Sequence, residues 1–182
     1  MDELVELFTH RAGLLGVRVE RVADADAAVP EIRLEAQMAV RQKLVVSAEL
    51  RRRAPSLVEL LEDHLTIETV TGAAAARDAP LALTLAHAAY AETGSVLLAE
   101  PDLADRSVGM LSRTPIVVVE TAMLRSGLDD AVAELRAIAR QPGGGYATVM
   151  TGPSRTADIE RVLTVGVQGP GRIVVLFVDA LA

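Results

Sequence analysis

The sequence contains no cysteine and no tryptophan, and aromatic residues make up only 2% of its 182 residues. Without thiolates the chain forms no disulfide bond and cannot itself ligate an iron–sulfur cluster. Aromatic side chains that could anchor a binding surface are scarce. The core must therefore be built from Leu, Val, Ile and Ala.

Basic charge is also scarce, and the formal net charge is −7. This argues against nucleic-acid binding, because contacts of Lys and Arg with phosphate supply most of that affinity. The densest basic run, Arg51-Arg52-Arg53, is more typical of a solvated face than of a phosphate site. No apolar run reaches the ~20 residues of a membrane span, and the acidic N-terminus lacks a signal-peptide pattern. We therefore expect a cytoplasmic protein that binds neither nucleic acid nor membrane.

The three histidines, His10, His64 and His87, lie far apart and do not form a zinc-binding motif. The sequence therefore predicts no metal site. The glycine run of residues 143–145 is not followed by Lys-Ser or Lys-Thr, so it is no P-loop, and it is more typical of a helix stop.

Hydrophobic residues make up 51% of the chain and charged residues 24%, as in one globular domain with a substantial core. Apolar periodicity predicts helices over residues 2–12, 30–41, 56–62, 78–90 (a short helix with a connector), 101–111 and 126–140. It predicts strands over residues 17–22, 43–47, 64–70, 95–99, 115–119, 146–150 and 173–178.

Several of these strands are continuous Val/Ile/Leu runs, and they alternate with helices along the chain. Such a pattern predicts an α/β fold with a mostly parallel sheet that is covered by helices on both faces. In sheets of this kind ligands bind at the carboxyl ends of the strands. The loops that follow residues 115–119 and 146–150 would open there if both strands are parallel.

One stretch, Thr151 to Glu160, combines more polar residue types than any other part of the chain. It can be an anion cradle, in which Gly152 allows close backbone approach, Ser154 and Thr156 offer hydroxyls, and Arg155 offers a charged fork. A helix beginning there would add free N–H groups. It can equally be a turn that caps a helix, with Asp158 pairing with Arg161 on the surface.

A second polar turn, Glu92-Thr93-Gly94-Ser95, precedes the predicted strand of residues 95–99. Its glutamate could act as a nucleophile or general base. A lone acid on a turn is more often simply solvated. His87 could orient Glu92, or be an ordinary partly buried histidine.

These two motifs together resemble the LUD-domain family, which includes LutC-type and YkgG-type proteins. GPSRTADIE at residues 152–160, continued by GVQGP at 166–170, resembles the family's C-terminal signature, and AETGS at 91–95 resembles a second family element. The resemblance covers the C-terminal half to two-thirds of the chain. It implies a Rossmann-like three-layer sandwich similar to the NagB/RpiA/CoA-transferase superfamily, as one LUD-like domain over residues 1–182 with residues 1–41 as an N-terminal helical segment packed on it.

The resemblance also implies a LutC-like role in lactate utilisation, accessory to iron–sulfur subunits that oxidise L-lactate to pyruvate. Iron–sulfur clusters are then expected only in those partner subunits. Association into a homo-oligomer and binding of a small organic anion are compatible with this role. The residues expected to face the ligand are Thr93, Gly94, Ser95, Gly152, Ser154, Arg155, Thr156 and Asp158.

The alternative is a protein that acts alone, binding a CoA ester, a nucleotide or an organic anion, or an enzyme of the CoA-transferase-like superfamily. Some of those enzymes use a glutamate in a Glu-x-Gly context as the nucleophile, which makes Glu92 the candidate catalytic residue. This alternative requires Glu92 to face Ser154 and Arg155 across one crevice. A third option is a member kept for assembly or regulation, with a degenerate pocket.

Overall fold

A six-stranded parallel sheet forms the centre of the protein in a computed structural model, which describes residues 1–39, 43–77, 79–141, 145–157, 163–165 and 169–181. The strand order is β1-β12-β7-β4-β2-β3, and all the pairs are parallel. The strands are β1 (Arg18–Asp24), β2 (Lys43–Val46), β3 (Thr66–Thr69), β4 (Leu81–Leu85), β7 (Pro115–Glu120) and β12 (Val174–Ala180). The predicted α/β class with a mostly parallel sheet is therefore confirmed.

Alternate residues of the central strands point to opposite faces, and each face has its own hydrophobic core. In β7, Ile116 and Val118 belong to one core, whereas Val117 and Val119 belong to the other. Because both faces are buried, the strands are continuous apolar runs.

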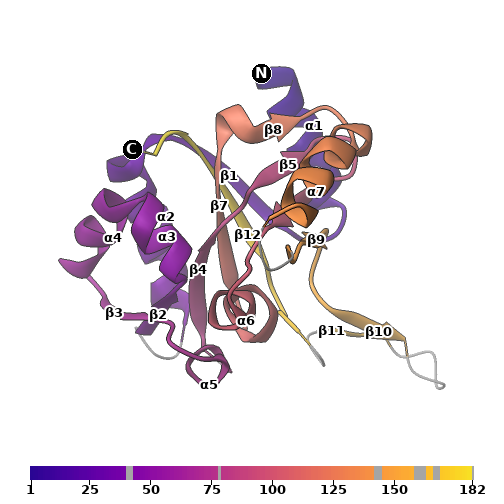
Figure 1. Cartoon of the computed structure of the whole chain (residues 1–182). Coiled ribbons are helices and arrows are strands. Elements are labelled where there is room, and N and C mark those ends of the chain that lie inside the picture. Colours follow the sequence, from indigo (N-terminus) through magenta and orange to yellow (C-terminus); the bar gives the residue numbers. More distant parts are fainter. Residues whose placement is uncertain (40–42, 78, 142–144, 158–162, 166–168, 182) are drawn as a thin grey trace.

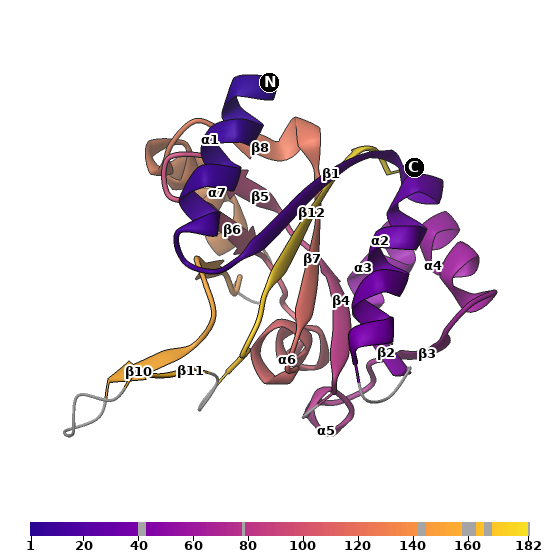
Figure 2. The same cartoon turned by 180° about the vertical axis from the view of Figure 1, so that it is seen from behind.

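Helices cover both faces of the sheet and make it the middle of three layers (Figures 1 and 2). The helices that pack with the first core are α2 (Ala25–Met38), α3 (Ala48–Arg53) and α4 (Pro55–Glu62). The other face carries α1 (Asp2–Gly13), α5 (Ala73–Ala76) and α6 (Leu103–Leu111). On α1, the buried Phe8 ring meets the Phe177 ring of β12 edge to face, with centroids 5.0 Å apart.

A second, four-stranded sheet, in the order β8-β5-β6-β9, packs against the face of the central sheet that also carries α1. Its strands are β5 (Ala88–Tyr90), β6 (Ser95–Leu98), β8 (Leu124–Arg125) and β9 (Thr148–Met150). After β4 the chain continues into β5, and after β7 it continues through η1 (Thr121–Met123) into β8. This sheet packs against α7 (Ala131–Ala139), which follows η2 (Leu128–Asp130).

Segment 78–90 is the largest error of the sequence prediction. It contains the central strand β4 and the strand β5, where a short helix and connector were expected. All the residues of β4 are buried, and β4 pairs with both β2 and β7. Leu and Ala favour helices only by fractions of a kcal/mol, so burial between two strands overrides that preference.

Two helix starts were also predicted wrongly. Helix α2 begins at Ala25, where the Asp24 side chain accepts a hydrogen bond from the N–H of Ala27 (2.9 Å), and Pro30 lies inside it rather than at its start. Helix α4 begins at Pro55 with no side-chain cap, so Ser56, the predicted first residue, does not cap it. Pro55 supplies a fixed φ and needs no partner for an N–H at the first helical position.

The apolar stripe of helix α7 is only partly buried. Ile138 is buried, but Leu128, Val132 and Leu135 are 38–48% exposed. The buried face is formed by Ala131 and Ile138, which pack with the second sheet. The small residue Ala131 brings this helix close to the sheet, and the larger side chains remain outside.

Candidate functional site

The turn of residues 91–94 depends on the conformation of Gly94. This glycine has φ +65°, and its N–H donates to the carbonyl of Tyr90 (3.0 Å). A Cβ at this position would lie 2.5 Å from the backbone nitrogen of Ala12. The turn therefore packs directly against the last turn of α1, and only glycine fits both the backbone and the contact.

Glu92 on the same turn is exposed, and its carboxylate is directed to the start of α7. Oε2 accepts a hydrogen bond from the N–H of Leu128 (3.1 Å), and the backbone N–H of Glu92 donates to the carbonyl of Ser126 (3.0 Å). A Cβ on Gly127 would lie 2.7 Å from Oε2, so glycine makes room for the carboxylate. Glu92 thus caps the first turn of the η2–α7 segment.

The two sequence motifs lie side by side because β6 pairs with β9. Val96 is opposite Met150 in this antiparallel pair, and the hydroxyls of Ser95 and Thr151 are hydrogen-bonded at 2.9 Å. Ser95 is 1% exposed, so this bond closes the base of the turn away from water. The stretch after β9 therefore starts beside the glutamate turn.

We expect Ser95→Ala and Thr151→Val each to lower the free energy of unfolding by about 1 kcal/mol, since a buried hydroxyl loses its partner. In the double variant the two effects should not add, with a coupling of at least 0.5 kcal/mol, because the second substitution removes a bond already lost. Urea unfolding of the four proteins measures this coupling. Additive effects within about 0.3 kcal/mol would show that the bond does not hold the motifs together.

The stretch from Gly152 to Arg155 meets the loop that follows α1. A Cβ on Gly152 would lie 3.3 Å from the Cβ of Leu15. The Arg155 guanidinium donates to the carbonyl of Leu15 (2.5 Å), and the backbone N–H of Ser154 donates to the carbonyl of Pro170 (2.9 Å). Both motifs therefore contact residues 11–15.

No helix begins at residues 151–157. Instead β10 (Arg155–Ala157) pairs with β11 (Leu163–Val165) as an antiparallel hairpin that projects from the body of the protein (Figures 1 and 2). The prediction of an anion site made of helix N–H groups is therefore wrong for this part of the chain. The alternative prediction, a helix capped by Ser154 or Thr156, is also wrong. The loop does not open at the carboxyl edge of a parallel strand either, because β9 is antiparallel to β6. Asp158 and its expected pairing with Arg161 lie outside the described residues, as does the side chain of Thr156.

Glu92 and Arg155 have different partners. The Glu92 carboxylate binds the backbone of Leu128, whereas Arg155 binds the backbone of Leu15. No hydrogen bond or ion pair joins Glu92 to Ser154 or Arg155 in the described part of the chain. Thr93 belongs to the glutamate turn, and its buried Oγ1 has no hydrogen-bond partner among the described residues.

The sequence prediction missed a buried acidic group just before α6. Glu100 is 4% exposed, and its Oε1 accepts a hydrogen bond from the hydroxyl of Thr84 on β4 (2.6 Å). Burial raises the pKa of Glu100 to about 7; the Thr84 hydroxyl lowers this pKa, and the nearby Asp105 carboxylate raises it further. No sequence signal marked Glu100 as buried, because Thr84 was not expected to lie on a strand.

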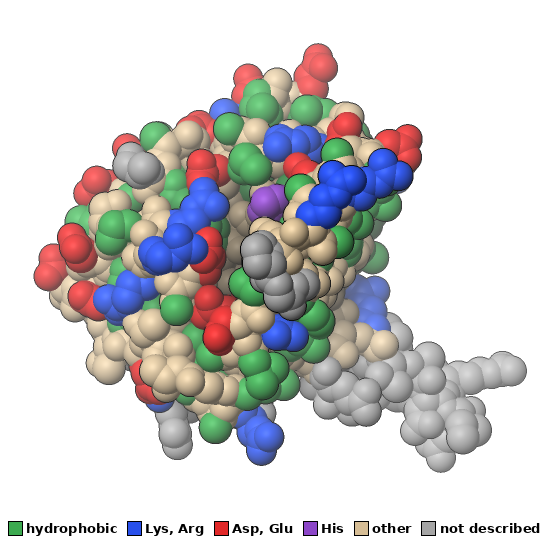
Figure 3. Space-filling model, in the orientation of Figure 1, with side chains coloured by type: hydrophobic (Ala, Val, Ile, Leu, Met, Phe, Trp, Pro, Cys, Tyr) green, Lys and Arg blue, Asp and Glu red, His purple; other side chains and the backbone are tan. Residues whose placement is uncertain are grey.

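Charged groups also gather where β2 and β7 end. The carboxylate of Asp105 accepts the N–H groups of Ala48 and Glu49 at the start of α3 (2.7 and 3.0 Å). Arg53 forms an ion pair with Glu120, 3.0 Å apart. Figure 3 shows acidic and basic side chains along one side of a hollow, with a histidine visible in it.

A family model described as the LUD domain matches residues 5–178. The chain belongs to the LUD-domain family. A crystal structure of a DUF162 family protein from Deinococcus radiodurans has the same fold as this LUD domain, with a TM-score of 0.69 at 22% identity over 97% of each chain. The Rossmann-like three-layer arrangement expected from the resemblance is thereby confirmed.

Curated relatives of this LUD domain include proteins named lactate utilization protein C. The one from Macrococcus caseolyticus is 31% identical over 106 residues, 57% of this chain and 46% of that protein. The one from Bacillus subtilis is 33% identical over 110 residues, 57% of this chain and 44% of that protein. YkgG of Escherichia coli, described as uncharacterized, is 26% identical over 170 residues, 89% of this chain and 73% of that protein. The match therefore spans a little under half the length of the proteins named for lactate utilisation.

Within its described residues, this LUD domain has no helix long and apolar enough to cross a membrane. The same residues contain no group of three or more His, Asp or Glu side chains placed to hold a metal ion.

Proposed function

We propose that this LUD domain serves a lactate-utilisation system as a LutC-like accessory component, working with iron–sulfur subunits that oxidise L-lactate to pyruvate. The similarity to several proteins named lactate utilization protein C supports this role. The chain has no cysteine, so thiolate ligands for the clusters would come from the partner subunits. The protein would act in the cytoplasm, and a second copy of the chain is a compatible partner.

The observation that favours an accessory role over catalysis is the set of partners of Glu92. Its carboxylate is hydrogen-bonded to the N–H of Leu128 at the start of η2, and among the described residues no hydrogen bond or ion pair joins it to Ser154 or Arg155. Its shape and charge suit a helix cap, since a carboxylate at a helix start binds free N–H groups. We infer that the glutamate turn holds α7 in place beside the ligand-facing stretch.

The proposed ligand-facing residues are Thr93, Gly94, Ser95, Gly152, Ser154, Arg155, Thr156 and Asp158. The Ser95–Thr151 hydrogen bond supports this grouping, because it places the two motifs next to each other. The buried Thr93 hydroxyl, which has no described partner, favours the alternative that the domain also binds a small organic anion, nucleotide or CoA ester by itself.

Affinity purification of the tagged chain from its native cells grown on L-lactate tests the proposal. We expect iron–sulfur proteins to copurify, and we expect deletion of the gene to abolish growth on L-lactate but not on glucose. A Glu92→Gln variant should restore growth, since its amide oxygen can still accept the N–H of Leu128. Normal growth on lactate after deletion would contradict the lactate role. Loss of growth with Glu92→Gln in a protein of unchanged stability would favour catalysis by Glu92.

A further inference from the structure

A cavity of about 650 Å³ opens at the opposite end of the main sheet from the glutamate turn. It is lined by residues that precede three central strands or begin them: Lys43 is the first residue of β2, Pro80 precedes β4, and Thr114 precedes β7. Glu92 lies beyond the carboxyl ends of β4 and β7. The cavity and the two family motifs are therefore separated by the length of the strands.

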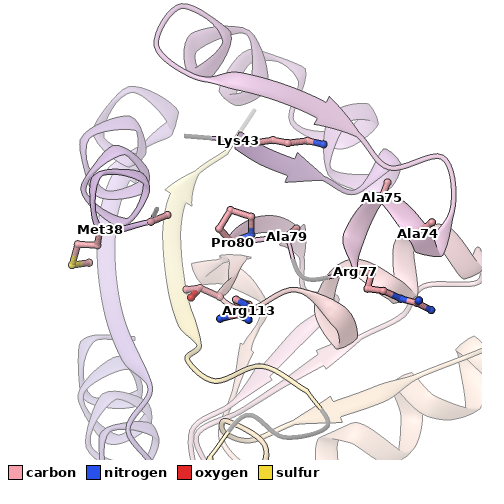
Figure 4. A pocket seen from close by; sticks show the side chains of 10 residues that line it. Met38, Lys43, Ala74, Ala75, Arg77, Ala79, Pro80 and Arg113 are labelled. Atoms are coloured by element: carbon pink, nitrogen blue, oxygen red, sulfur yellow. The ribbon is translucent and has the colours of Figure 1, made fainter. Parts of the chain in front are cut away.

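The charged side chains in the described lining of this cavity are all basic. Lys43, Arg77 and Arg113 line it, and its described lining includes no acidic side chain, although the whole chain has a net charge of −7. Lys43 is the only lysine of the chain. Figure 4 shows Lys43 and Arg113 on opposite sides of Pro80, with Arg77 beside the alanines of α5.

Apart from Thr114, the rest of the described lining is apolar, and it includes Met38, Ala75, Ala79 and Pro80. Because alanine side chains are small, they leave the volume of the cavity open, whereas larger residues would fill it. A cavity of this size is within the range of small-molecule sites, which combine apolar walls with a few polar groups that fix orientation.

Backbone hydrogen bonds position the basic rim. The N–H of Arg113 donates to the carbonyl of Ala79 (2.8 Å), and the carbonyl of Arg113 accepts the N–H of Gly171 (3.1 Å). Lys43 forms an ion pair with Glu68 of the neighbouring strand β3. Both side chains of that pair are more than 40% exposed, so an entering anion can replace Glu68 at little cost.

We propose that this cavity, which we name the amino-edge cavity, binds a small organic anion. A carboxylate or phosphate group binds at the basic rim, which carries Lys43, Arg77 and Arg113, and the apolar part of the molecule lies on Ala75, Ala79 and Pro80. The site is independent of Glu92, Arg155 and the proposed lactate role. Carboxylate and phosphate groups are both anions that Lys and Arg side chains bind through charged hydrogen bonds. The experiment below compares the two groups as separate series of probes.

The single lysine gives a direct readout of occupancy. Reductive methylation with ¹³C-formaldehyde keeps the charge of Lys43 and labels only this side chain and the N-terminal amine. The probes are straight-chain carboxylates from acetate to hexanoate and the matching monoalkyl phosphates. We expect a saturable shift of the Lys43 methyl signal, with affinity rising about threefold for each added CH₂ as apolar surface is buried.

Arg113→Ala should weaken the binding of the best probe about tenfold, because a hydrogen bond to a charged group is lost. Ala74→Leu retains all charges but narrows the cavity, and should weaken hexanoate more than acetate. Arg136→Ala, which removes an exposed arginine of α7, is the matched control. It should bind the probes with the affinity of the parent chain. The relative affinity of the carboxylate and phosphate series identifies the group that the site prefers.

No saturable shift with any probe would overturn the proposal. It would also be overturned if Arg113→Ala and Ala74→Leu bound the probes as well as Arg136→Ala does, since the shift would then come from general charge effects. Neither result would bear on the lactate role, which is tested by growth and copurification.

Discussion

Gly94→Ala is expected to lower the free energy of unfolding by about 3 kcal/mol, from the cost of a left-handed conformation and the clash of an added methyl group in a packed site. Gly94 has φ +65°, and a Cβ there would lie 2.5 Å from the nitrogen and 2.9 Å from the Cα of Ala12. These are backbone atoms of α1, so the clash cannot be relieved by a side-chain rotation. For a domain of this length the melting temperature should fall by roughly 6–12 °C.

Gly13→Ala is the matched control for this experiment. Gly13 is the last residue of α1, its φ is not positive, and a Cβ there would have no neighbour within 4 Å. Alanine favours the helix over glycine, so this variant should be as stable as the parent or slightly more stable. Urea unfolding followed by circular dichroism compares the two. Equal stability of Gly94→Ala and Gly13→Ala would contradict the close packing of the glutamate turn on α1.

The same substitution links stability to the candidate site. Helix α1 is followed by the loop whose Leu15 contacts both Gly152 and Arg155. Displacement of α1 by a methyl group on Gly94 would therefore move one wall of the stretch proposed to face the ligand. Gly94 is thus a structural requirement of the site, whatever its neighbours bind.

Strands whose apolar runs are unbroken were predictable from the sequence. Residues 115–119 and 173–178 were recognised because β-branched residues dominate them, and they form β7 and β12 in the middle of the sheet. Strand β4 was missed because its Leu-Ala-Leu-Thr-Leu sequence contains only one β-branched residue. What makes it a strand is its pairing with β2 and β7, which are distant in sequence.

The candidate site was predictable to a similar degree. The resemblance placed the two motifs together, and the Ser95–Thr151 hydrogen bond bears out that proximity. The partner of Glu92 was not predictable, because η2 and α7 begin at a point that depends on the β5–β8 pairing. The pairing of β10 with β11 was not predictable either, because each strand is only three residues long.

Buried polar groups are the hardest features to find in a sequence, and Glu100 is an example. In the sequence it is an acid before a proline at the end of a strand, which is typical of a solvated loop. In the structure it is buried just before α6, and it accepts a hydrogen bond from Thr84 of β4. Its environment follows from the stacking of α6 on β4, which residue patterns do not reveal.

Glu100 should make the protein less stable as the pH rises. Its pKa is about 7 in the folded protein, against an ordinary value of 4.5, mainly because burial disfavours the charged form. Between these two values the folded state binds more protons than the unfolded state, so the free energy of unfolding decreases with increasing pH. The stabilising contribution of the proton is complete below about pH 4.5 and lost above about pH 7, and it amounts to about 3 kcal/mol at 1.36 kcal/mol per pKa unit.

Glu100→Gln keeps an oxygen that can accept the Thr84 hydroxyl and removes the titration. As the pH rises from 4.5 to 8, the free energy of unfolding of the parent should fall by about 3 kcal/mol relative to that of this variant. Urea unfolding at several pH values gives the difference between the two proteins, in which the contributions of shared groups such as Asp2 and Asp179 cancel. Glu59→Gln, which removes an exposed carboxyl group of α4, is the control for the loss of one negative charge. If the two variants changed with pH in the same way, the loss of one negative charge would explain the effect. The result would then contradict a buried, protonated Glu100 beside Thr84.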